Sequence, residues 1–335
     1  MLRIRQIKHL VGRLGVTVEV LEKVAEAPER WCEELVLRDP ARPTKERTVL
    51  SVRGQLRQIQ VRMLRDVLLP ALTASEFSHG GVRGRHIKTN IEPHLQSVFA
   101  YTTDISDFYP SISRNRVYRL FQKTFECSPD VARICTKVCT HDHHLALGLI
   151  TSPILADQMM QEIDARIGCA CRSAGLAYSR YVDDLTISGW FDLEGSGFPN
   201  LVRRILQAHG LAINPQKERF GRLADGMSIT KIRVNRGRPD VRREYLAELD
   251  RQLADARRLA AGDQFEGPYY TDCQILGRLQ HVSWVNPARR RSLMRRFRAI
   301  QWDAAKREAE HRGLVAVRKT LSRCQSPQPL SAADR

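Results

Sequence analysis

The chain has 335 residues, of which 42% are hydrophobic and 27% are charged. These proportions are typical of a globular protein and exclude a largely disordered chain. Its 54 Lys and Arg residues outnumber the 37 Asp and Glu residues and give a net charge of +17, which indicates a polyanionic partner. No apolar stretch approaches the roughly 18–20 residues of a membrane-spanning helix, and the first residues lack the apolar core of a signal peptide. We therefore expect a cytoplasmic protein with no membrane partner.

The first hundred residues favour helices and turns. Residues 1–40 read as helical, whereas residues 41–97 are basic and interrupted by Pro and Gly. The run 98–104 is rich in β-branched and aromatic residues and predicts a strand. Ser111 or Ser113 is expected to cap the helix that follows it.

The middle of the chain alternates helices with short strands. Apolar residues at fourfold spacing predict a helix over about 153–173, which Gly175 ends. Two short strands are expected at 176–182 and 185–188. Because only Asp183-Asp184 separates them, and acidic residues fill strands poorly, these two acids are predicted to form a hairpin turn.

The last third of the chain becomes helical. A helix near 198–209 is followed by a strand-like segment at 211–214 and by a strand pair around 228–235. From about residue 241 the pattern is helical and basic. The order of these elements predicts an α+β fold, in which a core sheet lies between a basic N-terminal region and a basic helical C-terminal region.

One cluster of thiols and imidazoles offers a zinc site as an alternative function: Cys135, Cys139, His141, His143 and His144. The two cysteines are four residues apart in an apolar helical pattern, which is typical of buried thiols on the core face of a helix. Zinc sites more often pair ligands across a tight turn. The buried-thiol interpretation is therefore favoured.

The most informative motif is the acidic pair within residues 181–184 (YVDD). Adjacent carboxylates repel each other unless a cation compensates. Magnesium suits such a site because it takes oxygen ligands and is commonly completed by substrate phosphates. A solvated Asp-Asp turn is the alternative.

A second acidic residue stands at the end of the strand 98–104. If this strand lies beside the hairpin, Asp104 faces Asp183 and Asp184 across a gap of metal size. Three carboxylates can hold two metal ions about 3.5–4 Å apart, as in two-metal phosphoryl transfer. Together with the net charge, Asp104 favours the metal site over the solvated turn.

These residues resemble the palm of reverse transcriptases, over about residues 40–290. Residues 181–184 resemble the YxDD box of that family, and residues 104–109 resemble its first catalytic strand. Residues 148–153 (GLITSP) resemble the motif that opens the palm helix. Residues 211–217 (LAINPQK) resemble the motif whose lysine approaches the leaving pyrophosphate.

The resemblance implies a chemistry for each of these positions. Asp104, Asp183 and Asp184 would hold two Mg²⁺ ions, with the carbonyl of Ile105 as a further ligand. One ion would lower the pKa of the primer 3′-hydroxyl, and the other would neutralise the triphosphate and pyrophosphate. Lys217 would be the general acid for the leaving group, unless it is an ordinary exposed lysine.

The resemblance also implies a nucleotide site. Lys45 and Arg47 would clamp the triphosphate, with ordinary surface charge as the alternative. Tyr109 matches the aromatic gate that excludes a ribose 2′-hydroxyl. Related RNA polymerases carry Asp there instead, so the expected product is DNA. Gly148 and Tyr181 complete the predicted nucleotide site.

The fold implied is that of a right-hand polymerase, with fingers, an antiparallel palm and a helical thumb. The expected domains are an N-terminal helical region with fingers at 1–97 and a palm at 98–238, which includes a further fingers segment at about 113–147. A basic helical thumb at 239–324 and a disordered tail at 325–335 would follow.

Within the family, the chain most resembles retron reverse transcriptases and their relatives in phage defence. Asn90 and His94 stand in a segment (NIEPH) that resembles the retron NAxxH signature. Residues 229–235 occupy the place of the retron VTG element, with Lys231 in place of its glycine and in position to contact a phosphate. The implied partners are a structured non-coding RNA template, the RNA–DNA hybrid product, dNTPs, and a toxin or effector protein.

Basic side chains provide the expected nucleic-acid surface. Arginines crowd the segment 289–298 and alternate with apolar residues, which predicts a helix with one core face and one phosphate-facing surface. A merely solvated charged face is the alternative. The residues expected to contact nucleic acid, besides those of the retron motifs, are Arg83, Arg85, Arg278, Arg289, Arg290, Arg295 and Arg296.

Two other functions stay open. A non-retron defence enzyme could extend a primer or a protein hydroxyl without a template. A non-catalytic scaffold could hold structured RNA, but loss of an active-site carboxylate would signal that, and all three are present.

Overall fold

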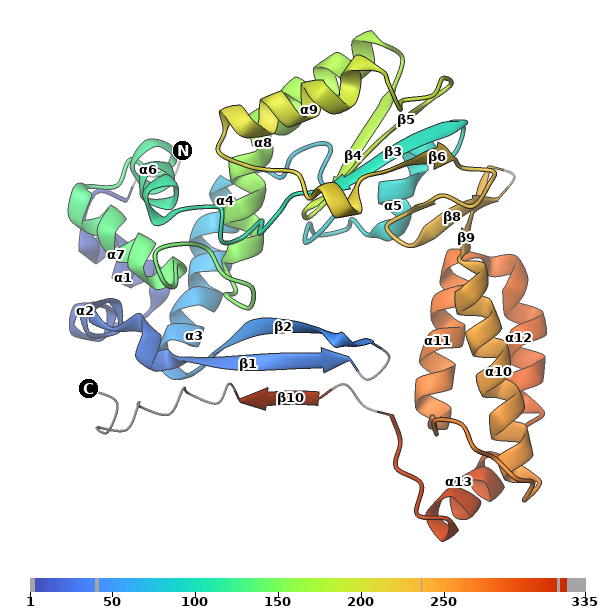
Figure 1. Ribbon diagram of the computed structural model, residues 1–335. Coiled ribbons are helices and arrows are strands. Elements are labelled where there is room, and N and C mark those ends of the chain that lie inside the picture. Colours follow the sequence, from blue (N-terminus) through green and yellow to red (C-terminus); the bar gives the residue numbers. More distant parts are fainter. Residues whose placement is uncertain (1–3, 40–41, 236, 318–319, 324–335) are drawn as a thin grey trace, which may run out of the picture. The chain divides into compact units, whose positions relative to one another are not determined.

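The computed structural model describes residues 4–39, 42–235, 237–317 and 320–323 (Figure 1). It mixes helices with antiparallel sheets, as the α+β prediction required. The chain divides into two compact units. Unit 1 contains residues 1–73, 107–159 and 318–335, and unit 2 contains residues 74–106 and 160–317.

Unit 1 is built from a three-stranded antiparallel sheet and a set of helices. Its sheet has the order β10-β1-β2, with strands β1 (Cys32–Asp39), β2 (Arg42–Val52) and β10 (Thr320–Arg323). Its helices are α1 (Ile7–Leu14), α2 (Val18–Glu26), α3 (Gly54–Arg62), α4 (Leu69–Ala71), α6 (Arg114–Thr124) and α7 (Pro129–Cys139), and a π-helical segment (Met63–Leu68) joins α3 to α4.

Strand β1 corrects the prediction that residues 1–40 are helical throughout. Its Glu-Glu-Leu segment suits a helix, but Leu35 and Val36 pair with Val49 and Thr48 of β2. Strand β2 is rich in β-branched residues, which favour an extended backbone. The pairing between the strands therefore overrides the local preference of residues 32–39.

Unit 2 contains the central sheet of the protein, a four-stranded antiparallel sheet of order β4-β5-β3-β6. Its strands are β3 (Phe99–Asp104), β4 (Ala177–Tyr181), β5 (Asp184–Gly189) and β6 (Arg219–Arg222). The long helix α8 (Ser152–Ser173) begins in unit 1 and ends in unit 2, and unit 2 also contains α5 (Ile87–Ile91) and α9 (Gly197–Ala208).

Strand β4 shows how helices cover both faces of this sheet. On one face, Tyr178 and Arg180 hydrogen-bond to Asp164 of α8. On the other face, Ser179 bonds to the carbonyl of Asn90 in α5 and to the ring of His94. The alternation of side chains along a strand places these neighbours on opposite sides.

The remainder of unit 2 is a small sheet followed by helices. The sheet contains β7 (Ser228–Ile229), β8 (Ile232–Asn235) and β9 (Arg238–Val241), and the helices are α10 (Arg243–Ala260), α11 (Asp272–Val285), α12 (Arg290–Arg298) and α13 (Trp302–His311). One buried apolar cluster runs from Ile232 and Val241 in the small sheet to Leu249, Leu279 and Leu293 in the helices. The small sheet and these helices therefore share a core.

One sequence prediction in unit 2 needs correction and another is confirmed. Residues 211–214 form no strand, and only an isolated bridge joins Ile213 to Ile105. The strand pair predicted around 228–235 is confirmed as β7 and β8, and Thr230 and Lys231 form the turn between them, with φ values of 45° and 67°. Two left-handed residues define a type I′ hairpin turn.

The division into two units differs from the expected order of domains. Residues 74–97 belong with the central sheet rather than with the N-terminal region, and residues 107–159 belong to unit 1. Residues 239–317 share a unit with the central sheet, because the apolar cluster is continuous. The division into fingers, palm and thumb stays a prediction, and the tail predicted at 325–335 lies outside the described residues.

Candidate active site

The acidic hairpin forms as expected, with its turn one residue earlier than predicted. Tyr181 pairs with Asp184 across the hairpin, so Val182 and Asp183 are the turn residues. Asp184 is the first residue of β5 and also pairs with Asp104 at the end of β3. This register brings the two distant acidic segments side by side.

The three predicted carboxylates meet. One ligand oxygen from each of Asp104, Asp183 and Asp184 lies within 4.8 Å of the others. Asp104 is buried, and the other two side chains are half-buried. In the part of the chain that the structure describes, this is the only group of three or more His, Cys, Asp or Glu residues close enough to hold a metal ion.

The electrostatics of the cluster reflect crowded negative charge. Burial, and then the neighbouring Asp104, raise the pKa of Asp183 to about 6. Burial, then Asp183, then Asp104, raise the pKa of Asp184 to about 7. Repelling carboxylates with this proton affinity also attract divalent cations, because a cation neutralises the charge that a proton otherwise neutralises.

Lys217 is the nearest cation to the cluster. Its Nζ lies 2.5 Å from Oδ1 of Asp104. It ends a short 3-10 helix, Pro215–Lys217, which begins where Oδ1 of Asn214 accepts a hydrogen bond from the amide of Gln216. The structure thus places Lys217 beside Asp104, and its role as general acid stays a prediction.

The backbone of Ile105 also reaches the hairpin. Its amide donates to the carbonyl of Asp183 over 3.0 Å. Its predicted role as a carbonyl ligand to a metal stays a prediction.

The residues predicted for the nucleotide site, apart from Tyr181, belong to unit 1. Arg47 is exposed on β2, whereas the side chain of Lys45 lies outside the described part of that strand. Tyr109 is half-buried, with its ring centre 5.5 Å from that of Phe108. Their grouping with the carboxylates of unit 2 stays a prediction.

Gly148 has a clear structural reason to be glycine. Its φ is +107°, a conformation that residues with a Cβ rarely adopt. A Cβ here would lie 2.1 Å from the carbonyl oxygen of Leu50 in β2. The carbonyl of the preceding residue, Leu147, accepts a hydrogen bond from the amide of Leu50. The segment thus packs directly on the β2 backbone.

Three residues predicted to contact nucleic acid make hydrogen bonds within the protein. Asn90 and His94 are fully buried, and their direct contacts with nucleic acid stay a prediction. His94 hydrogen-bonds to the hydroxyls of Ser188 and Ser179, and burial lowers its pKa to about 3. A buried, neutral imidazole offers no charge to a phosphate.

Arg85 also has a structural role, because it donates to the carbonyls of Ser75, Glu76 and Ser78. These hydrogen bonds hold the segment 75–78 in place. Arg83, two residues earlier, is exposed, as is Lys231 in the β7–β8 turn.

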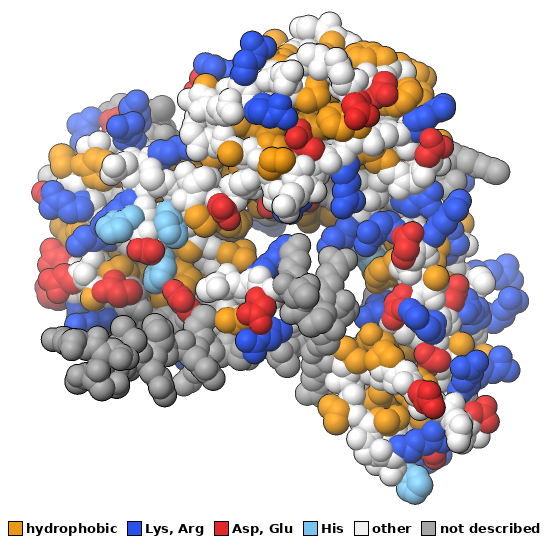
Figure 2. Space-filling model, in the orientation of Figure 1, with side chains coloured by type: hydrophobic (Ala, Val, Ile, Leu, Met, Phe, Trp, Pro, Cys, Tyr) orange, Lys and Arg blue, Asp and Glu red, His pale blue; other side chains and the backbone are white. Residues whose placement is uncertain are grey.

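The basic helices carry the remaining predicted contacts. Arg290, Arg295 and Arg296 are exposed, and Arg296 pairs with Asp250 over 2.5 Å. Arg289 pairs with Asp240 over 2.6 Å. Both arginine side chains stay partly exposed in these pairs. Lys and Arg side chains gather over the part of unit 2 that contains α10–α12 (Figure 2).

The guanidinium of Arg278 lies against an aromatic ring. Its central carbon is 4.6 Å from the ring centre of Tyr270. Such stacking fixes the orientation of an arginine while its outer donors stay available.

A pocket of about 660 Å³ lies between α10 and α12. Arginines from both helices line it, over an apolar floor that includes Leu253 and Ile300. The sequence predicted Arg295 and Arg296 but missed Arg257 and Arg258. The sequence around Arg257 and Arg258 does not indicate a pocket, because Arg295 and Arg296, which line it from α12, lie about forty residues further along the chain.

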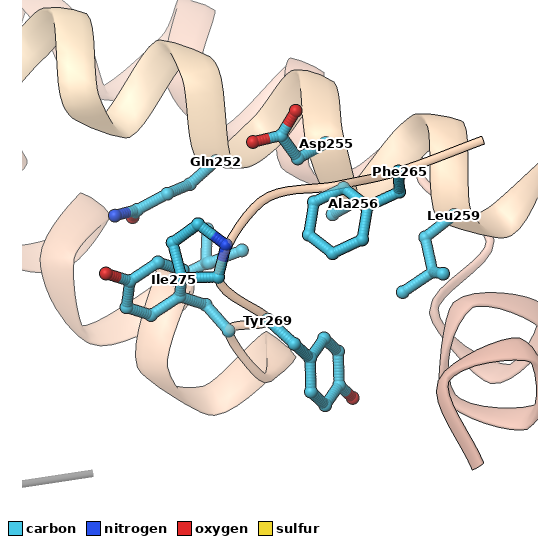
Figure 3. A pocket seen from close by; sticks show the side chains of 9 residues that line it. Gln252, Asp255, Ala256, Leu259, Phe265, Tyr269 and Ile275 are labelled. Carbon is cyan, nitrogen blue, oxygen red and sulfur yellow. The ribbon is translucent and has the colours of Figure 1, made fainter. Parts of the chain in front are cut away.

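A second pocket in these helices is too small to bind a nucleotide. Gln252, Phe265, Tyr269 and Ile275 line it (Figure 3). Its volume is about 10 Å³, which is close to the space of one water molecule. We interpret it as a packing gap.

The zinc alternative is not supported. Cys135 and Cys139 are fully buried on α7, and burial raises the pKa of Cys139 to about 12. Among the described residues, these cysteines and the nearby histidines do not come close enough together to form a group of three metal ligands. The interpretation of these residues as core thiols is confirmed.

The match to known families agrees with this site. Residues 42–250 match the family described as reverse transcriptase (RNA-dependent DNA polymerase), and the chain belongs to this family. Asp104, Asp183 and Asp184 lie inside the matched segment.

The relatives are retron enzymes. The chain is 31% identical over 197 residues to the retron Ec86 reverse transcriptase of Escherichia coli. This match covers 57% of this chain and 61% of the relative. It is 28% identical over 206 residues to the retron Se72 reverse transcriptase of Salmonella heidelberg (strain 579083-10), with 60% and 54% covered. It is 26% identical over 315 residues to the retron Mx65 reverse transcriptase of Myxococcus xanthus, with 86% and 70% covered. The match thus spans a little over half the length of the first two relatives.

The helices of the described residues include none with both the length and the apolar character needed to cross a membrane. The predicted cytoplasmic location stays a prediction.

Proposed function

We propose that this chain is an RNA-directed DNA polymerase with a right-hand fold, which copies a structured non-coding RNA into DNA. The observation that carries the proposal is the meeting of Asp104, Asp183 and Asp184 at one hairpin, in a chain of the reverse transcriptase family. In this assignment the four-stranded sheet of unit 2 is the palm.

The donor set of the site fits Mg²⁺. It consists of carboxylate oxygens, and burial together with mutual repulsion raises the pKa of two of them. Asp104, Asp183 and Asp184 would hold two ions, with the carbonyl of Ile105 as a further ligand. When bound, magnesium supplies Lewis-acid activation of the primer hydroxyl and neutralises charge on the triphosphate.

Lys217 would protonate the leaving pyrophosphate. In the structure it pairs with Asp104 over 2.5 Å, so its charge offsets part of the negative charge of the cluster. An ammonium group held at this place can move a short distance to a phosphate oxygen, because its four-carbon stem is flexible.

The nucleotide site would consist of the residues that the family resemblance assigns to it. These are Tyr181, Tyr109, Gly148, Lys45 and Arg47. In this role, the ring of Tyr109 excludes a ribose 2′-hydroxyl. The two basic side chains bind the triphosphate oxygens.

The basic helices would hold the RNA template and the RNA–DNA hybrid. Arginines of α10 and α12 surround a pocket of about 660 Å³, and α11 contributes Arg278. Arg289, Arg290 and Lys231 extend the charge toward the small sheet. Contacts to phosphates make affinity fall steeply with salt.

Retron DNA synthesis in defence against phage is the particular role we favour, because the relatives compared above are named as retron reverse transcriptases. The structured RNA would then be the retron transcript, and a toxin or effector protein would be a further partner. Template-independent or protein-primed synthesis is a competing outcome.

Sequencing the nucleic acid that copurifies with the protein tests the proposal. DNA that is copied from, and joined or annealed to, a structured RNA supports it. Random or homopolymeric DNA would instead indicate template-independent synthesis.

The matched controls are Asp183→Ala and Asp225→Ala. Asp225 is an exposed acid of the same unit, so its variant should retain the DNA. The Asp183→Ala protein should retain RNA and lose DNA. Identical nucleic acids from wild type and Asp183→Ala would indicate a non-catalytic RNA scaffold.

A further inference from the structure

The turn that carries Asp183 has a backbone conformation that its sequence disfavours. Val182 has a φ of +61°, in the left-handed region where a β-branched residue is an outlier. For an L-residue this region is unfavourable, because the Cβ crowds the carbonyl oxygen that follows it. Contacts from outside the turn must therefore stabilise it.

Two such contacts act on the two carbonyls of the turn. The carbonyl of Val182 accepts a hydrogen bond from Nη1 of Arg180 over 2.9 Å. The carbonyl of Asp183 accepts one from the amide of Ile105 over 3.0 Å. Because both carbonyls are fixed, the peptides that flank the metal-binding carboxylates have little freedom to rotate.

Arg180 is itself held in place by α8. Its Nε and Nη2 donate to the carboxylate of Asp164 over 2.8–3.0 Å. The two side chains are 1% and 0% exposed. The hydroxyl of Tyr178 donates to the same carboxylate over 2.8 Å. The planar guanidinium of Arg180 thus links Asp164 on α8 to the carbonyl of Val182 in the turn.

Gly80 supports the turn from another side. A Cβ at Gly80 would lie 2.5 Å from Cγ2 of Val182, so the two residues are in close contact. The segment before it runs alongside β4, because Phe77 and His79 exchange backbone hydrogen bonds with Arg180. The turn is therefore enclosed by backbone as well as by the arginine.

A purely stabilising role does not account for this arrangement. Buried ion pairs are often replaced by apolar residues with no loss of stability, whereas removing one partner is strongly destabilising. An apolar pair would fill the space between β4 and α8. It could not donate a hydrogen bond to the carbonyl of Val182.

We propose that Arg180 is a positioning residue, which holds the Val182–Asp183 turn in its left-handed form and so sets the carboxylates for metal binding. Asp164 fixes the guanidinium, and Ile105 fixes the other end of the turn. This inference rests on the proposed function, since it names what organises the same metal site.

The test removes the whole buried network at once. The variant Arg180→Met/Asp164→Leu/Tyr178→Phe leaves no buried charge without a partner. Mn²⁺ binding is measured by electron paramagnetic resonance, together with thermal unfolding and the Mg²⁺ concentration that gives half-maximal primer extension. We expect the Mn²⁺ dissociation constant to rise about 10–100-fold, the usual effect of losing a partner outside the ligand shell, while the melting temperature stays near that of wild type.

Tyr178→Phe alone is the matched control, because it removes one bond to Asp164 and leaves the contact between Arg180 and Val182. Its Mn²⁺ affinity should be unchanged, even if its melting temperature falls. If the triple variant does not fold, Arg180→Lys is measured in the same way. It keeps a charge near Asp164 and lacks the second arm that reaches Val182.

An Mn²⁺ affinity within about twofold of wild type, in a folded triple or Arg180→Lys variant, would overturn the positioning role. Wild-type protein that binds Mn²⁺ but makes no DNA would instead refute the proposed function, and the Mn²⁺ comparison would still decide the role of Arg180. Wild-type protein that binds no Mn²⁺ would overturn both.

Discussion

Replacing Asp184 by asparagine should stabilise the metal-free protein, and increasingly so as the pH rises. Burial and the neighbouring carboxylates raise the pKa of Asp184 from 3.8 to about 7 in the folded protein. When the pKa of a carboxyl group is higher in the folded than in the unfolded protein, the free energy of unfolding falls as the pH rises between these two values. The folded wild type therefore weakens between about pH 4 and pH 7, and Asp184→Asn lacks this loss.

The magnitude follows from the same pKa values. A tenfold change in proton affinity corresponds to about 1.4 kcal/mol, so the ceiling for Asp184 alone is about 4 kcal/mol above pH 7. Asp183 titrates together with it, and both side chains are partly open to solvent. We therefore expect about 1–3 kcal/mol. For a unit of about 190 residues this is a gain of about 3–10 °C in melting temperature.

The assay is thermal unfolding by circular dichroism from pH 5 to pH 8.5 in EDTA. The exposed Asp225→Asn variant serves as the control and should follow wild type. The advantage of Asp184→Asn should grow up to about pH 7 and then level off. Added Mg²⁺ should stabilise wild type and leave Asp184→Asn nearly unchanged. An advantage that does not change with pH, or a less stable variant at pH 8, would refute the reasoning.

Three other substitutions test separate parts of the structure. Gly148→Ala should lower the free energy of unfolding in urea by about 1–3 kcal/mol because of its backbone conformation alone. The contact of the new Cβ with Leu50 should lower it further. An unchanged urea midpoint would contradict this packing. Lys231→Gly should raise the melting temperature slightly, because φ is +67° there, and should weaken RNA binding in a fluorescence titration; tighter binding would remove Lys231 from the RNA surface. Tyr109→Ala should admit ribonucleotides in primer extension, and unchanged sugar selectivity would refute its role as a gate.

The acidic site was predictable because each of its residues stands in a short segment with a recognisable pattern. Adjacent carboxylates between two apolar strands already indicate a turn and a cation, and Asp104 ends a strong strand pattern. The position of the turn was missed by one residue, because its register depends on pairing with β3. Asp184 is a poor strand residue by itself, but it pairs with both Tyr181 and Asp104.

Burial was much less predictable than chemistry. His94 and Arg180 carry polar side chains that suggest a surface, yet both are buried by partners that their local sequence does not reveal. His94 is satisfied by two serine hydroxyls from different strands, and Arg180 by an aspartate sixteen residues earlier. Strand β1 was missed for a related reason, because only its pairing with β2 reveals it.

Primer extension on an RNA template by purified wild type, Asp183→Asn and Asp225→Asn tests the central claim most directly. Each protein is supplied with a DNA primer, dNTPs and Mg²⁺, and its RNA affinity is measured in parallel. We predict that wild type and Asp225→Asn synthesise complementary DNA, whereas Asp183→Asn falls to background with its RNA affinity intact. Undiminished synthesis by Asp183→Asn, or none by wild type, would contradict the assignment of this acidic cluster as a polymerase active site.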